Sequence, residues 1–115
     1  MNGKLRTPAD NPGYRLLRES RIAEFNALKA EGKLGDLTHL DLRATNLRGI
    51  DAAGLDLSGC YFRQSDLRGI DFSTTNLRGA SINGAKISGA LFPAELSAAE
   101  LELSLVHGTR MRYNR

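Results

Sequence analysis

Large apolar residues recur at every fifth position from residue 37 to residue 92. The series has twelve members without a gap, and only one is small: Leu37, Leu42, Leu47, Ala52, Leu57, Phe62, Leu67, Phe72, Leu77, Ile82, Ile87 and Phe92. On an α-helix a step of five residues turns the side chain by about 140°, so these side chains would not form a stripe. In a straight strand an odd step would place successive members on opposite faces. The spacing therefore predicts a chain that bends once in every five residues and points each member inward.

The positions around each apolar residue also favour a bend. The residue two before it is small or apolar, which suits a second inward site. The residue just before it is Asp or Asn in eight of the twelve steps, and these side chains cap turns by accepting nearby backbone N–H groups. The residue two after it is glycine at seven positions, where positive φ or a tight corner is allowed. If each bend is near a right angle, four pentads close a coil of twenty residues, and about three coils stack at the ~4.8 Å spacing of paired strands.

The stretch from "GDLTHLDLRATNL" to "NLRGASINGAKISGALF" resembles the pentapeptide-repeat proteins, whose consensus is A(D/N)LXX, over residues 35–92. The resemblance implies an all-β solenoid, a right-handed quadrilateral parallel β-helix. "LTHLDLRATNL" also reads like a leucine-rich repeat. That repeat needs its pattern again after about 20 to 29 residues, whereas the leucines here continue every five, so we disfavour it.

The segments on either side of the repeats are expected to be helical. We predict a single domain in three parts: a tail and capping helix over residues 1–34, the coil over residues 35–94, and a short helix with a basic tail over residues 95–115. One amphipathic helix is expected from Tyr14 to Glu31, and a second helix follows the capping-box pattern of Ser97 and Glu100. Exposed coil ends invite aggregation, so these helices either cover the ends of their own chain or form a homodimer interface.

Composition limits the class of protein further. The formal charge of +3 arises in residues 1–35, which carry seven Lys or Arg against four Asp or Glu, whereas residues 36–92 carry six of each sign. The chain has no apolar run of the length that a membrane span or a signal peptide requires, so we expect a cytoplasmic protein that does not contact a membrane. The closing "LSLVHGTRMR" resembles the tails of some bacterial pentapeptide-repeat proteins.

Groups that could carry catalysis are few. His39 and His107 are far apart in the sequence and have no Cys or second His at ligand spacing, so no zinc site is expected. The lone Cys60 is expected to be a small buried hydrophobe. The glycines of "NGAKISG" follow the pentad rule and predict corners, not a phosphate loop. We therefore expect no enzyme activity, no cofactor and no metal.

One outward feature is a candidate partner-binding site. With twenty residues in a coil, Arg43 should lie beside Arg63 and Arg48 beside Arg68, which forms a two-by-two group around one corner. Such a group could grip an acidic partner, a phosphate or a carboxylate. The alternative is that Asp41 and Asp66 neutralise it on a solvated face, where exposed pairs contribute little.

Three functions remain open from the sequence. The first is a non-catalytic interaction or scaffold module with an unknown protein partner. The alternative, which the resemblance implies, is regulation of DNA gyrase by mimicry of duplex DNA; the short, electrically balanced coil argues against it. The third is direct binding of an anion or a nucleic acid through the arginines and the basic helix. Nucleic acid is the least favoured ligand, because no stacking aromatics alternate with the arginines.

Overall fold

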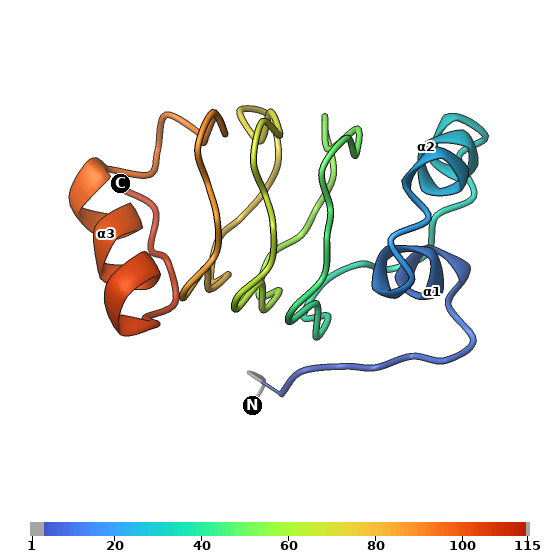
Figure 1. Ribbon diagram of the computed structural model, residues 1–115, viewed down its shortest axis with the longest axis horizontal. Helices are drawn as coiled ribbons and strands as arrows, with labels where there is room; N and C mark the ends of the chain where they lie inside the picture. The colour runs from blue at the N-terminus through green and yellow to red at the C-terminus, as the bar shows by residue number, and fades with distance from the viewer. Residues whose placement is uncertain (1–3, 115) are drawn as a thin grey trace.

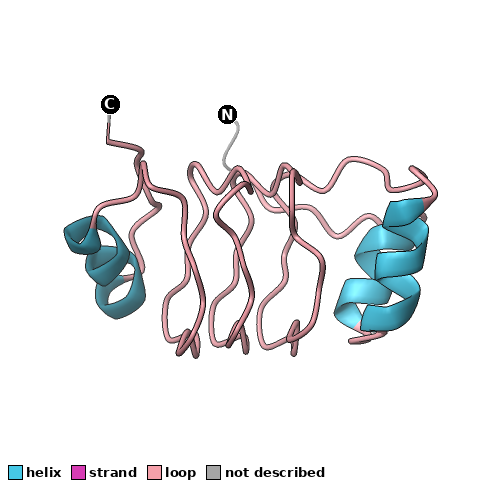
Figure 2. Ribbon diagram, turned by 90° about the horizontal axis from the view of Figure 1, so that it is seen from above, coloured by secondary structure: helices cyan, strands magenta, loops and turns pink. Residues whose placement is uncertain are grey.

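The structure is a computed structural model that describes residues 4–114. Its regular elements are three helices: α1 (Pro12–Arg18), α2 (Ile22–Ala30) and α3 (Ala98–His107). Between α2 and α3 the chain winds into a stack of coils, with α1 and α2 at one end and α3 at the other (Figures 1 and 2). The helices therefore lie where the coil would otherwise end in open backbone.

The coils are held together by hydrogen bonds between residues about twenty positions apart. Six isolated parallel bridges within the stack each join residues that differ by twenty in number. At one of them the amide of Ser81 donates to the carbonyl of Cys60 at 3.0 Å, and the amide of Phe62 donates to the carbonyl of Ser81 at 2.8 Å. The predicted coil length of twenty residues is thus confirmed.

Residues 4–114 contain no continuous strand, so the predicted all-β class is not confirmed. Every pentad spends part of its length in a turn, which leaves only an isolated bridge on each side of the coil. The pairing therefore has the direction and spacing of a parallel sheet without strands long enough to form one.

The turns follow the predicted chemistry closely. At all eight predicted Asp or Asn positions, the side-chain Oδ1 accepts the amide hydrogen of the residue two places later. All seven predicted corner glycines have φ between 68° and 92°. Three corners use another residue in the same left-handed conformation, with φ of 56° to 60°: His39, Ala44 and Gln64. Hydrogen bonding by the Asx side chain thus supports the bend in eight of the twelve pentads, and turns without it, such as those after Phe62 and Ile82, are closed by a backbone bond. Glycine is the common but not the obligatory corner residue.

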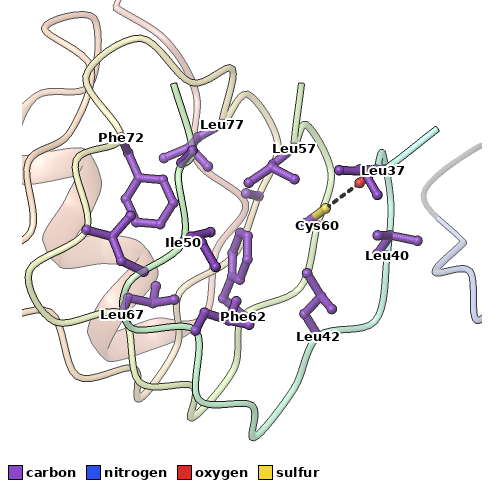
Figure 3. Close-up of a cluster of buried hydrophobic side chains, with 14 of the residues drawn as sticks. Leu37, Leu40, Leu42, Ile50, Leu57, Cys60, Phe62, Leu67, Phe72 and Leu77 are labelled. Atoms are coloured by element: carbon purple, nitrogen blue, oxygen red, sulfur yellow. Dashed lines mark hydrogen bonds between the residues drawn. The ribbon is translucent and has the colours of Figure 1, made fainter. Parts of the chain in front are cut away.

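The apolar residue of each pentad points into the coil, as predicted (Figure 3). The ten members from Leu37 to Ile82 are buried, and Ile87 and Phe92 are half-buried where the last coil meets the C-terminal segment. Rings one coil apart pack directly, with the centroids of Phe72 and Phe92 5.8 Å apart. The core is a continuous column of side chains, which is the arrangement that the period of five required.

The second inward sites are filled by small or apolar residues, four of which hydrogen-bond to the backbone through their side chains: Thr45, Cys60, Ser65 and Thr75. Ser65 Oγ donates to the carbonyl of Leu42 at 2.6 Å, and Thr75 Oγ1 donates to the carbonyl of Ala52 at 2.7 Å. Cys60 is fully buried and its Sγ lies 3.0 Å from the carbonyl oxygen of Leu37. Burial raises the pKa of the Cys60 thiol to about 12, so this cysteine is a core residue, as predicted.

The prediction of one helix from Tyr14 to Glu31 is wrong, because the helix breaks after Arg18. Ser20 has φ of 57°, and the amides of Ser20 and Arg21 close the turn by donating to the carbonyls of Leu17 and Leu16. A straight helix over the predicted residues would run for about 27 Å in one direction. The break instead lets α1 and α2 both lie against the same coil end, where Tyr14, Leu17 and Phe25 are buried.

The helices and the segment before them supply hydrogen-bond partners to the first coil. The amide of Arg6 donates to the carbonyl of His39, and the carbonyl of Arg6 accepts from the amide of Asp41, which adds an outer rung to the coil. The side-chain amide of Asn26 donates to the carbonyl of Gly49 and accepts from the amide of Asp51. These groups replace the coil that would otherwise lie on this side.

The last coil is closed by α3 and the segment that follows it. As predicted, Ser97 Oγ accepts the amide of Glu100, and Gly108 with φ of 77° ends α3. The Glu100 carboxylate does not complete a capping box and binds Arg112 instead. Met111, which is buried, exchanges backbone hydrogen bonds with the last coil: its amide donates to Ala80 and its carbonyl accepts from Gly79.

Tyr113 allows this closure to be tested. Its hydroxyl accepts the amide of Leu77 at 2.9 Å and lies 3.3 Å from the carbonyl of Thr75. Tyr113→Phe leaves both backbone groups without that partner, so we expect the free energy of unfolding in urea to fall by about 1–3 kcal/mol. Tyr61→Phe is the matched control, because the Tyr61 hydroxyl hydrogen-bonds only to the exposed Arg63 in the described part of the chain. Equal stability of the two variants would contradict a structural role for Tyr113.

Candidate functional site

The four predicted site arginines lie on two neighbouring sides of the coil. We define the Leu42 face as the side built on Leu42, Phe62 and Ile82, and the Leu47 face as the side built on Leu47, Leu67 and Ile87. Parallel bridges join Asp41 to Tyr61 and Asn46 to Asp66. The register therefore sets Arg43 beside Arg63 on the Leu42 face, and Arg48 beside Arg68 on the Leu47 face. A partner-binding role for these four residues stays a prediction.

Two of the arginines are neutralised by an aspartate two residues earlier. Nε and Nη2 of Arg43 donate to the two carboxylate oxygens of Asp41 at 2.9 and 2.8 Å. Arg68 binds Asp66 in the same way at 2.9 and 2.7 Å. The hydrogen bonds from the arginine lower the pKa of each aspartate, that of Asp66 to about 2. In the motif Asp-Leu-Arg the carboxylate thus both caps the turn and pairs with the guanidinium.

The third arginine has neutral partners. Arg63 donates from Nε to Asn83 Oδ1 at 2.9 Å and from Nη1 to the hydroxyl of Tyr61 at 2.8 Å. The guanidinium carbons of Arg43 and Arg63 both lie within 6 Å of the centroid of the Tyr61 ring, at 5.6 and 5.8 Å. The positive charge of Arg63 is therefore oriented by its neighbours but not cancelled by any of them.

The fourth arginine differs from the others in its immediate surroundings. Arg48 follows Asn46 in the motif Asn-Leu-Arg, and Asn46 Oδ1 accepts the amide of Arg48 at 3.2 Å. Among residues 4–114 the guanidinium of Arg48 makes no hydrogen bond and no ion pair, although its charge also helps to lower the pKa of Asp66. Asn46 therefore caps its turn as Asp41 and Asp66 cap theirs, but it does not pair with the guanidinium, so the charge of Arg48 stays available.

Arg48 and Arg68 border a groove of about 600 Å³ on the surface. One wall comes from the turn between α1 and α2, and the other from the corner glycines of the Leu47 face. The lining residues are Ser20, Ile22, Asn46, Arg48, Gly49, Arg68 and Gly69. The sequence could place the arginines but not this groove, because the groove depends on the unpredicted break between the helices.

Comparison with protein families identifies the repeat. Residues 56–92 match the family model described as Pentapeptide repeats, in eight copies. This segment consists of pentapeptide repeats. The pentapeptide-repeat turns and the twenty-residue register begin earlier in the structure, at residues 36–41, so the same conformation covers more of the chain than the match does. Two departures from the repeat pattern fall in this earlier part: Ala52 in place of a large central residue, and His39 in place of a corner glycine.

Two other comparisons were negative. A search of curated proteins and a search of solved structures returned no match.

Other types of site are not found in the described residues. No group of three or more His, Cys, Asp or Glu side chains in residues 4–114 is placed to hold a metal ion. Within the same range no helix has both the length and the apolar character that crossing a bilayer requires.

The lowered pKa of Asp66 predicts a pH dependence. A carboxyl whose pKa is lower in the folded state stabilises the fold above its usual pKa of 3.8, and this contribution is lost as the pH falls towards 2. We expect the difference in melting temperature between the wild-type protein and Asp66→Asn to shrink over that range. Asp56→Asn is the matched control, because Asp56 caps its turn but pairs with no arginine among residues 4–114. Such a pair titrates between roughly pH 5 and pH 2. A difference in melting temperature that stays constant over this range would contradict the lowered pKa of Asp66.

Proposed function

We propose that this chain is a non-catalytic interaction module that binds a protein partner through the outward side chains of its coils. We also propose that the coils form the right-handed quadrilateral β-helix typical of pentapeptide repeats. The observation that carries the functional proposal is the fixed register of outward side chains. Residues twenty apart lie side by side, and each is held by a hydrogen-bonded turn. A rigid backbone of this kind lowers the entropic cost of binding, because only side chains such as Arg48 remain to be ordered.

The arginines are the part of this surface that a partner is proposed to contact. Arg43, Arg48 and Arg63 are exposed and Arg68 is half-buried, so all four are accessible from one corner. None of the four arginines belongs to the buried core, so changing their head groups leaves that core intact. The function can therefore be separated from the fold by mutation.

The test is a pull-down from the native host, with co-purifying proteins identified by mass spectrometry. We expect the wild-type protein to retain a partner, and we expect a variant with Arg43, Arg48, Arg63 and Arg68 changed to Gln to lose it while keeping its circular dichroism spectrum. A control variant carrying Arg15→Gln and Arg78→Gln removes charge away from this corner and should keep the partner. Absence of any partner above background, together with a monomeric solution mass, would refute the proposal.

We also propose that two copies of the chain form a homodimer through their terminal helices. The solution mass tests this directly. Both helical ends pack on their own coil, so dimerisation would use their outer sides. On α3, Leu103 and Val106 remain 38% and 59% exposed. These two side chains are available to a second copy.

A second candidate function is regulation of DNA gyrase by mimicry of duplex DNA. One observation favours it: the two sides of the coil away from the Leu42 and Leu47 faces carry four aspartates, Asp36, Asp51, Asp56 and Asp71. Asp36 and Asp51 are paired with Arg6 and Lys29. Duplex DNA carries about one negative charge per 1.7 Å of axis, so one copy imitates only a short length of it.

A supercoiling assay tests this candidate. If the protein imitates DNA, wild-type protein should inhibit gyrase, and changing Asp56 and Asp71 to Asn should weaken that inhibition, because each caps its turn and forms no ion pair in residues 4–114. The Asn side chains can still cap both turns, so the fold should be kept. Supercoiling that is unaffected by excess wild-type protein would remove this candidate.

A further inference from the structure

The charges of the coil are segregated, although their sum is zero. The Leu42 and Leu47 faces carry five cations and two anions: Arg43, Arg48, Arg63, Arg68 and Lys86 against Asp41 and Asp66. The two opposite sides carry four aspartates and one cation, Arg78. A neutral total therefore conceals one strongly basic side, whereas two of the aspartates opposite, Asp36 and Asp51, are paired with Arg6 and Lys29 from outside the coil. The basic side will attract and orient an acidic partner.

Within the basic side, most of the cations already have partners. Asp41 and Asp66 bind Arg43 and Arg68 through two hydrogen bonds each, and Arg63 is bound by Asn83 and Tyr61. Only a guanidinium that can exchange water for a partner, without first breaking an ion pair, gains fully from binding an anion. By that criterion Arg48 is the arginine best prepared to receive one.

The groove beside Arg48 supplies further groups of the right kind. Nε and Nη2 of Arg68 are used by Asp66, and its Nη1 makes no hydrogen bond among residues 4–114. Ser20 Oγ accepts the amide of Asn46 at 3.3 Å and donates to no group in the same range. Ile22 adds an apolar wall. Donors and an apolar surface occur together, which suits a peptide segment better than an isolated ion.

We propose that the groove lined by Arg48, Arg68 and Ser20 binds carboxylates of an acidic segment in the protein partner. This inference rests on the proposed interaction function and specifies the chemistry of the partner. Asn46 is the residue that sets the specificity, because it caps its turn without consuming the charge of Arg48. Phosphate chains are the less favoured ligand. Affinity for nucleic acid grows with the number of phosphates neutralised. Tyr61, the ring on this side that could stack on a base, already lies beneath two arginines.

The test uses pairs of variants that interchange Asn and Asp. In Asn46→Asp, the new carboxylate can still accept the amide of residue 48. It can also accept two hydrogen bonds from the guanidinium of Arg48, as Asp66 does from Arg68. Binding of a labelled oligoglutamate peptide, followed by fluorescence anisotropy at low salt, should weaken by about five-fold. Asn76→Asp is the matched control, because it makes the same change of charge in an equivalent turn on another side of the coil. It should bind the peptide like the wild-type protein.

The reverse exchange should strengthen binding. Asp66→Asn keeps the turn and releases Arg68 into the groove, so the peptide should bind more tightly than it binds the wild-type protein. Asp41→Asn releases Arg43 outside the groove with the same change of charge, and it should have a smaller effect. Short duplex DNA is titrated in parallel with every variant, to compare the two classes of polyanion directly.

Several results would overturn the proposal. They are no binding of the peptide by wild-type protein, tighter binding of duplex DNA than of the peptide, or equal effects of Asn46→Asp and Asn76→Asp. If Asn46→Asp does not fold, Arg48→Gln decides the matter, because the guanidinium of Arg48 bonds to nothing in residues 4–114. If the partner found by pull-down still binds Arg48→Gln with full affinity, the interaction function stands and this site is wrong.

Discussion

The hydrogen-bonded turn that recurs every five residues is the feature on which each coil depends. In nine pentads the amide three residues after the central apolar residue donates to that residue's carbonyl, and in eight pentads an Asp or Asn side chain accepts the amide two residues later. These bonds hold the bend that follows the central apolar residue, and a corner residue with positive φ completes the turn. Because the same bend recurs every five residues, the apolar side chains return to a common interior. Parallel backbone bonds can then form between residues twenty apart. The core, the register and the outward ladders all follow from a local interaction that is repeated along the chain.

The sequence predicted the features that repeat and missed those that occur once. The inward column, the Asx turns, the corner glycines and the twenty-residue coil all follow from a period that is visible over twelve pentads. The break between α1 and α2 was missed because no Gly or Pro marks it, and Ser20 takes a positive φ in response to packing and hydrogen bonds with the first coil. Glu100 likewise matched a local capping pattern, but its carboxylate binds the later Arg112. Interactions between segments distant in sequence leave no periodic signal.

The same limit applies to the candidate site. Placing Arg43 beside Arg63 and Arg48 beside Arg68 required only the coil length. Predicting which of them keep their charge required knowing that an aspartate two residues before an arginine both caps the turn and pairs with the guanidinium. An asparagine in the same place caps the turn alone. Aspartate and asparagine are therefore equivalent for the turn, but they differ in whether the neighbouring arginine keeps an unpaired charge. Exchanging one for the other changes the charge that the surface presents without disturbing the core.

The segments at the two ends of the chain add their rungs to the same ladder. Arg6 pairs beside Leu40 on one edge, and Met111 pairs beside Ala80 on the other, with the coil residues near Cys60 between them. A mechanical load applied through the two ends would reach the outermost rung on each side first. Those rungs would peel away one hydrogen bond at a time, instead of resisting together in shear. Under tension the protein should therefore yield at its closures while the central coils stay intact.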